Sequence, residues 1–167
     1  MICVLGSGCI GISISNNSNI ENSLLCDISK EAISIVNENI ILNKALKCSA
    51  IVTNLFSNID VKNDIDIIVS NPPYIKSVVI ETLDEYVKNE PILALDGGKN
   101  GLDMYIRILN ECVTCLKDEA YVIFEIGYDQ KEDLINLINN NKYFEYIECI
   151  QDLNLNDRVV VCRFHQI

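Results

Sequence analysis

An amide side chain, two prolines and an aromatic ring follow directly on a short apolar run. The run is residues 65–69, and Asn71, Pro72, Pro73 and Tyr74 come after it. A short run of Ile and Val bounded by breakers is typical of a strand that is covered on both faces. Because proline lacks the N–H that a sheet needs and holds the preceding residue extended, the strand must end with Asn71 at its carboxyl edge. In open α/β sheets this edge binds the ligand.

The polar groups at this predicted strand end are mostly hydrogen-bond acceptors. The side-chain oxygen of Asn71 and the carbonyl groups of Asn71, Pro72 and Pro73 accept, and the Asn71 NH2 group is the spare donor. Such a set suits a substrate NH2 group, because two acceptors can hold both hydrogens of a planar nitrogen and leave its lone-pair face open. Tyr74 can pack against the planar group. The alternative is a strand followed by an ordinary proline turn.

A glycine-rich turn lies near the start of the chain. Gly6, Ser7 and Gly8 follow a short apolar segment, residues 1–5, which predicts a strand, a turn and then a helix. Glycines let backbone N–H groups approach a ligand, and the N-terminus of the following helix favours a carboxylate. The alternative is a tight turn that serves packing alone.

Asp27 ends the next predicted strand, residues 23–27. It follows the glycine turn by about twenty positions, the spacing of nucleotide-binding folds. A carboxylate at the end of the second strand can accept hydrogen bonds from both ribose hydroxyls. The alternative is that Asp27 caps a helix that starts near Ser29.

The remaining segments predict alternating helices and strands. Helices are expected over residues 29–43, 103–117 and 129–141, with Asp129 and Glu132 as a capping pair. Further strands are expected over residues 48–53, 120–127, 144–150 and 159–164, the last two as a terminal hairpin. The pattern predicts a single α/β domain over residues 1–167, with a seven-stranded, mostly parallel sheet and a terminal antiparallel strand.

A long connection, residues 75–95, follows the predicted ligand edge and leads into a glycine-rich turn at residues 96–101. We expect it to be irregular. Long connections over a ligand edge often form a lid or a substrate rim. The alternative is a surface loop without a role.

Composition narrows the classes of partner. The net charge is −11 and no basic run exists, which argues against nucleic acid, since Lys and Arg supply most of that affinity. The negative net charge is consistent with a protein substrate. The apolar stretches are far shorter than the about 20 residues that span a bilayer, and no basic-then-apolar leader follows Met1. We expect a cytoplasmic protein that makes no membrane contact.

The chain has eight cysteines, most of them among Ile, Val and Leu. Cys112 and Cys115 form a C-x-x-C pair, but no second pair and no nearby His completes a zinc site. We expect reduced core residues and no metal.

Taken together, the motifs resemble those of the peptide chain release factor glutamine methyltransferases. Asn71-Pro72-Pro73-Tyr74 is similar to the signature of amino-directed methyltransferases that use S-adenosylmethionine. The other segments that carry the resemblance, in order, are residues 6–10, Asp27, residues 90–95, residues 97–102, residues 124–127 and residues 157–159. The resemblance covers essentially the whole chain.

The resemblance implies a Rossmann-like class I fold, S-adenosylmethionine as cofactor, and methyl transfer to the amide nitrogen (N5) of the glutamine in the Gly-Gly-Gln motif of release factors. Asn71, Pro72 and Tyr74 would be catalytic, and these three with Pro73 would bind the substrate. The residues that would bind the cofactor are Val4, Leu5, Gly6, Ser7, Gly8, Asp27, Asn54, Leu55 and Asn71. Alignment of a weakly nucleophilic amide with an activated methyl is mostly a positioning task, so no dedicated base is expected.

The chain departs from the family pattern in several places. Ile2 and Val4 replace the first Asp and Gly of the usual Asp-x-Gly-x-Gly-x-Gly, Leu5 replaces a small hydroxyl residue, and Asn54 replaces an Asp. The small helical domain that family members carry before this one is not in the chain. Two alternatives therefore accompany the first function. One is a methyltransferase of a ribosomal-protein glutamine or a nucleic-acid amine, and the other is a truncated, catalytically inactive domain.

Overall fold

The computed structural model describes residues 2–4, 8–83 and 90–167. The strands are β1 (Ile2–Val4), β2 (Ser23–Asp27), β3 (Cys48–Val52), β4 (Ile65–Ser70), β5 (Leu116–Glu125), β6 (Phe144–Gln151) and β7 (Asp157–Phe164). The helices are α1 (Cys9–Asn17), α2 (Lys30–Leu42), α3 (Ser77–Ile80), α5 (Ile92–Leu95), α6 (Asp103–Glu111), the 3-10 turn η1 (Cys112–Thr114) and α7 (Lys131–Asn139).

The strands form one sheet in the order β3-β2-β1-β4-β5-β7-β6. Strands β1 to β5 pair in parallel, whereas β7 runs antiparallel to both β5 and β6. The order reverses direction between β1 and β4, which are neighbours although two strands separate them in the chain. Ligands of doubly wound sheets bind at this switch point, beyond the carboxyl ends of the strands. The predicted α/β fold with its antiparallel strand is confirmed.

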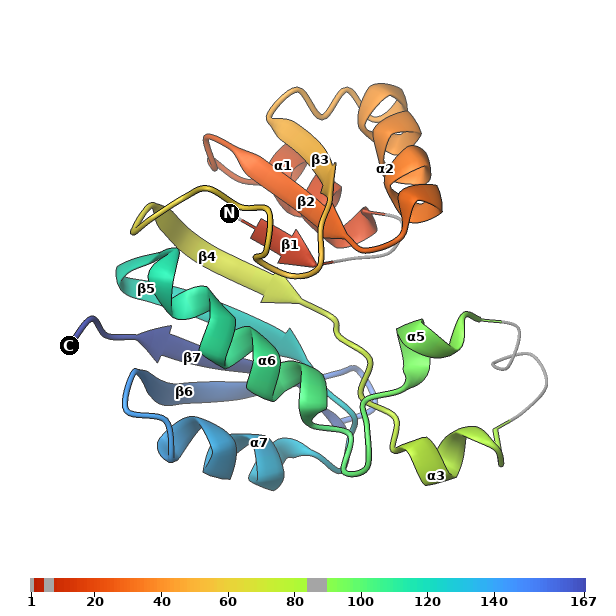
Figure 1. Ribbon diagram of the computed structural model, residues 1–167, viewed down its shortest axis with the longest axis vertical. Coiled ribbons are helices and arrows are strands. Elements are labelled where there is room, and N and C mark those ends of the chain that lie inside the picture. Colours follow the sequence, from red (N-terminus) through yellow and green to blue (C-terminus); the bar gives the residue numbers. More distant parts are fainter. Residues whose placement is uncertain (1, 5–7, 84–89) are drawn as a thin grey trace.

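Helices cover both faces of the sheet (Figure 1). The core members of the face under α1 and α2 include Ile12, Leu25, Val36 and Val69. The core members of the face under α6 and α7 include Cys26, Ile68, Ile108, Phe124 and Leu134. Neighbours such as Leu25 and Cys26 point to opposite faces, as the period of two in a strand requires.

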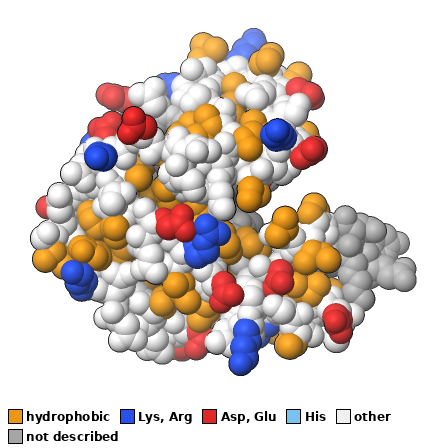
Figure 2. Space-filling model, viewed as in Figure 1, with side chains coloured by type: hydrophobic (Ala, Val, Ile, Leu, Met, Phe, Trp, Pro, Cys, Tyr) orange, Lys and Arg blue, Asp and Glu red, His pale blue; other side chains and the backbone are white. Residues whose placement is uncertain are grey.

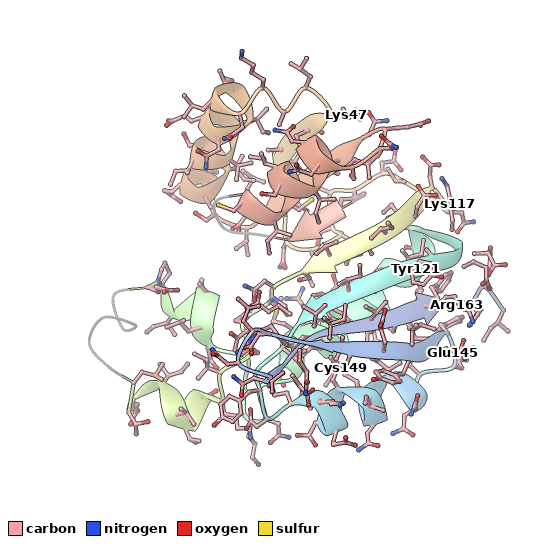
Figure 3. The ribbon with its side chains drawn as sticks, turned by 180° about the vertical axis from the view of Figure 1, so that it is seen from behind. Lys47, Lys117, Tyr121, Glu145, Cys149 and Arg163 are labelled. Carbon is pink, nitrogen blue, oxygen red and sulfur yellow. The ribbon has the colours of Figure 1, made fainter. Side chains whose placement is uncertain are left out.

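Seen from behind, α1 and α2 lie over only the β1–β2–β3 part of their face (Figure 3). Tyr121, Glu145 and Arg163 extend from β5, β6 and β7 on the other part. Arg163 contacts Glu145 at 2.7 Å and Glu119 at 3.2 Å, so charged side chains cover this end of the sheet. Within the described ranges, no helix combines the length and the apolar character needed to cross a membrane.

The predicted helix over residues 103–117 was wrong at its end. The helix stops at Glu111, η1 follows, and β5 already begins at Leu116. The reason is tertiary pairing: Leu116 pairs with Ile65, and the Cys115 carbonyl accepts hydrogen bonds from the backbone of Asp64 and Ile65. The apolar residues of this segment have a spacing that suggests a helix, but in the structure they are the buried residues of η1 and of the start of β5.

Two further expectations need correction. Asp129 and Glu132 do not form the capping pair of α7, because Gln130 occupies the N-cap position and Asp129 pairs with Lys76 at 3.5 Å. The connection at residues 75–95, expected to be irregular, contains the single-turn helices α3 and α5 in its described parts, and residues 84–89 lie outside the described residues.

Candidate active site at the carboxyl edge of the sheet

The end of β4 places Asn71 at the sheet edge, as predicted. Its side chain is exposed and makes no hydrogen bond to any residue that the structure describes, while Pro72 is buried. Ser70, the last residue of β4, is 1% exposed, and its hydroxyl also has no partner there. The exposed carboxamide of Asn71 can therefore bind a ligand at the switch point, whereas the hydroxyl of the adjacent Ser70 is buried.

The glycine-rich turn at residues 96–101 packs directly on the loop that follows Pro73. The N–H of Ile75 donates to the Leu95 carbonyl at 3.0 Å, and the N–H of Gly97 donates to the Ile75 carbonyl at 2.8 Å. A Cβ atom at Gly97 would lie 2.7 Å from the Tyr74 Cα, so only glycine fits. The turn supports the predicted substrate loop.

Tyr74 is half-buried beside this turn. Burial raises the pKa of its hydroxyl, Glu125 raises it further, and Arg158 opposes the shift. The phenol therefore stays neutral around pH 7 and presents a flat ring with one polar tip.

Gly8 lies at the N-terminus of α1, beyond the end of β1. Its φ is 82°, a left-handed conformation that favours glycine, and a Cβ atom there would lie 3.2 Å from both methyl groups of Val36. The backbone of Val4 pairs with Cys26 and Ser70, which places the end of β1 between those of β2 and β4. The other predicted ligands in this turn, Leu5, Gly6 and Ser7, lie outside the described residues.

Asp27 lies at the end of β2, and the helix cap is a different residue. Ser29 caps α2, because its hydroxyl accepts from the N–H of Ala32 at 3.1 Å. Asp27 instead accepts from the Ser29 N–H at 2.8 Å. Burial raises the pKa of the Asp27 carboxyl, and the N–H groups of Ser29 and Ile28 oppose this shift. The half-buried acid at the strand end can receive the hydroxyl groups of a ligand.

The segment after β3 gives a mixed result. The Asn54 side-chain oxygen accepts from Arg107 Nη2 at 3.1 Å, so this oxygen already has one partner. Leu55 has a φ of 50°, and its side chain is 4% exposed within the core. Phe56, 8% exposed, is also buried. Leu55 and Phe56 are thus core residues, and the cofactor contact of Leu55 remains a prediction.

Gln130 and Arg158 contact this region. Gln130 was not predicted from the sequence, and Arg158 was noted only as part of the segment 157–159, without a role in the site. Gln130 donates to the carbonyl groups of Tyr74 and Gly101, each at 3.0 Å. Arg158 donates to the Ile126 carbonyl at 3.0 Å and pairs with Asp152 at 3.4 Å. The contact between Gln130 and Tyr74 joins residues 56 positions apart, so no local pattern indicates it.

The surface is indented between the α2–β3 part and the lobe that carries α3 and α5 (Figure 2). The carboxyl ends of β1, β2 and β4 meet at this edge. Residues 3–98 match the family model described as the methyltransferase small domain. The chain belongs to this family.

Curated relatives of this methyltransferase domain act on glutamine. The release factor glutamine methyltransferase of Fusobacterium nucleatum is 39% identical over 159 residues, which are 95% of this chain and 45% of the relative. That of Clostridium botulinum is 40% identical over 161 residues, 95% of the chain and 56% of the relative. The ribosomal protein uL3 glutamine methyltransferase of Francisella tularensis is 38% identical over 126 residues, 75% of the chain and 40% of the relative. The chain spans about half the length of these relatives.

Solved structures share the fold of the methyltransferase domain. The ribosomal protein L11 methylase of Lactobacillus delbrueckii has a TM-score of 0.71 at 18% identity, over 99% of this chain and 69% of that one. A methyltransferase of Pyrococcus furiosus has a TM-score of 0.70 at 16% identity, over 100% and 75% of the two chains. The expected Rossmann-like class I methyltransferase fold is confirmed.

Proposed function

We propose that the chain transfers a methyl group from S-adenosylmethionine to the side-chain amide nitrogen of a glutamine, the one in the Gly-Gly-Gln motif of a peptide chain release factor. The observation that carries this proposal is the exposed Asn71 carboxamide at the switch point of the sheet, which has no hydrogen-bond partner among the described residues. The glutamine chemistry of the relatives and the order of the motifs support the substrate.

The groups at the edge fit this cofactor. Asp27 would receive the ribose hydroxyls, and the N-terminus of α1 at Gly8 would face the carboxylate. A solved relative in fold, a putative methyltransferase of Streptococcus mutans, is in complex with SAH. When bound, the cofactor supplies a methyl group already activated by the sulfonium.

The chain's own residues then have to hold the amide. The side-chain oxygen of Asn71 and the carbonyl of Pro72 would accept the two amide hydrogens, which leaves the nitrogen lone pair facing the methyl group. Two prolines with fixed φ keep these acceptors in place. Tyr74 lines the pocket as a neutral phenol. The proton leaves to water after transfer, so the rate enhancement comes mostly from alignment.

A second candidate keeps the chemistry and changes the protein. A glutamine of a ribosomal protein carries the same amide, and one relative is named for such an activity. A nucleic-acid amine fits less well, because the net charge of −11 repels a polyanion. Both protein substrates belong to translation, so we place the enzyme in the cytoplasm. We also infer that residues 1–167 form one methyltransferase domain.

The direct test is transfer of labelled methyl from S-adenosylmethionine by the purified chain. The acceptors are a release factor, the same factor with Asn in place of the motif glutamine, a uL3-type ribosomal protein and a DNA duplex. We expect label on the intact release factor alone, located on the glutamine amide by mass spectrometry. Label on the ribosomal protein alone would favour the second candidate. Label on DNA alone, or on none of the acceptors, would reject the proposal.

A further inference from the structure

We propose that Gln130 is a positioning residue for the amide-binding loop, which it fixes through the backbone carbonyl of Tyr74. This inference rests on the proposed function. Gln130 lies outside the loop, at the N-cap of α7, and connects the end of β5 with the site.

All hydrogen-bonding capacity of the Gln130 side chain except one lone pair is spent on backbone groups. Its NH2 group donates to the carbonyls of Tyr74 and Gly101, each at 3.0 Å, and its oxygen accepts from the Gly127 N–H at 2.9 Å. The residue is 2% exposed. These three hydrogen bonds hold the segments that they connect rigidly together, because the loss of any one of them leaves a buried polar group unsatisfied.

Glycines make the room for this side chain. A Cβ atom at Gly101 would lie 2.6 Å from Gln130 Nε2 and would also clash with the Tyr74 carbonyl. Gly101 has a φ of 74°, which favours glycine as well. A Cβ atom at Gly127 would lie 3.0 Å from Gln130 Oε1. Two of the three residues that hydrogen-bond to the Gln130 side chain, Gly101 and Gly127, are thus glycines that permit its close approach.

The hydrogen bonds of Gln130 act on the amide-binding loop, residues 70–74. Ser70 pairs with Phe124 of β5, which fixes the start of the loop, and the Tyr74 carbonyl fixes its end. Between them, Pro72 and Pro73 have locked φ angles and no N–H groups. The bonds of Ile75 hold the loop to the turn after α5, whereas Gln130 links it to the end of β5. Without Gln130 the amide-binding loop would rotate about Ser70, and the acceptor groups of Asn71 and Pro72 would move.

The test compares Gln130→Met, which keeps the length and removes the hydrogen bonds, with Gln130→Glu, which keeps the acceptor toward Gly127 and removes both donors. The control is Gln166→Glu, the same change at an exposed glutamine. We measure kcat on the release factor, KM for the release factor and calorimetric Kd for S-adenosylmethionine, below the melting temperature of each variant. Hydrogen exchange of the Ile75 and Gly97 amides is compared with that of Leu25 in β2.

We expect kcat to fall about 100-fold in both Gln130 variants, the cost of a displacement of about 1 Å in a reacting group. The Kd for S-adenosylmethionine should not change, exchange should rise at Ile75 and Gly97 but not at Leu25, and Gln166→Glu should match the wild type. A folded variant with kcat within twofold of the wild type would overturn the inference. So would a loss of kcat matched by a loss of cofactor affinity, with exchange unchanged at Ile75 and Gly97.

Failure of the proposed function is a separate result. If the wild-type chain methylates no release factor, the function is rejected, and exchange alone decides on Gln130. An increase in hydrogen exchange confined to the Ile75 and Gly97 amides would then support the claim that Gln130 fixes the loop, and unchanged exchange would overturn that claim. If Gln130→Met does not fold, Gln130→Glu carries both measurements.

Discussion

Asp27 shows how two local effects compete within one carboxyl group. Burial at the end of β2 raises its pKa, and hydrogen bonds from the Ser29 and Ile28 N–H groups lower it. Burial is the larger effect, so the acid protonates at a higher pH than an exposed aspartate. Only the ionised form offers acceptors alone to the two ribose hydroxyls.

We therefore expect Asp27→Asn to weaken binding of S-adenosylmethionine about tenfold, which corresponds to about 1.4 kcal/mol. Affinity of the wild type should fall as the pH decreases through the raised pKa of Asp27, and the variant should lack this dependence. Calorimetric titrations across that pH range measure both effects. Asp133→Asn, an exposed change on α7, serves as the control. Equal affinities of the wild type and Asp27→Asn would exclude the ribose contact.

Gly97 supplies a prediction about close packing. A methyl group there would lie 2.7 Å from Tyr74 Cα, so Gly97→Ala must move the substrate loop or the turn. We expect methyl transfer to fall about 100-fold, as for other misplacements of about 1 Å. Asn100→Ala, at an exposed position of the same turn, should keep full activity. An unimpaired Gly97→Ala enzyme would show that the loop tolerates displacement.

The sequence predicts the positions of Asn71 and Asp27 because their signals are local. A proline pair cannot continue a central strand, and an acid about twenty residues after a glycine turn marks the second strand of a nucleotide fold. Gln130 gives no such signal, and Arg158 was marked only by the resemblance of the segment 157–159. Gln130 contacts Tyr74 and Gly101, which come 56 and 29 positions earlier, so its role depends on the finished fold.

At the scale of elements, the sheet was more predictable than the ends of the helices. The residues of β2 and β4 alternate between two cores and are bounded by breakers, which fixes their limits. The end of α6 depends instead on pairing between Leu116 and Ile65, 51 residues apart in number, which the spacing of apolar residues does not reveal.

Tyr105 connects α6 to β5 and gives a prediction about this packing. The side chain is 0% exposed, its hydroxyl donates to the Glu125 carbonyl at 2.9 Å, and its ring meets Phe124 edge to face at 5.2 Å. Tyr105→Phe keeps the ring and removes the hydrogen bond. We expect the free energy of unfolding to fall by about 1 kcal/mol, measured by urea denaturation. No change would mean that the hydroxyl contributes nothing net to the docking of α6.

At the scale of the whole molecule, the antiparallel half of the sheet ends in a charged cluster. His165 follows β7 and contacts Glu119 of β5 at 2.8 Å and Glu145 of β6 at 3.2 Å. Hydrogen bonds from the imidazole to Glu145 and Glu119 raise its pKa above 6.5. The cluster joins three strands that neighbour one another in the sheet.

The raised pKa of His165 makes stability depend on pH. A group whose pKa is higher in the folded state stabilises the fold fully below its unfolded value, here 6.5, and loses this contribution as the pH rises through the folded value. We expect the difference in melting temperature between the wild type and His165→Ala to be largest below pH 6.5 and to shrink above it. His165 is the only histidine of the chain. A difference that does not vary with pH would contradict this.

The most direct test of the whole account is methyl transfer to the release factor glutamine by Asn71→Ala. The side chain of Asn71 is exposed and has no partner among the described residues, so its removal should leave the fold intact. We expect the product measured by mass spectrometry to fall at least about 100-fold. Asn37→Ala, an exposed change on α2, should retain full activity. Transfer by a folded Asn71→Ala enzyme within a few fold of the wild type would contradict the claim that this carboxamide holds the substrate amide.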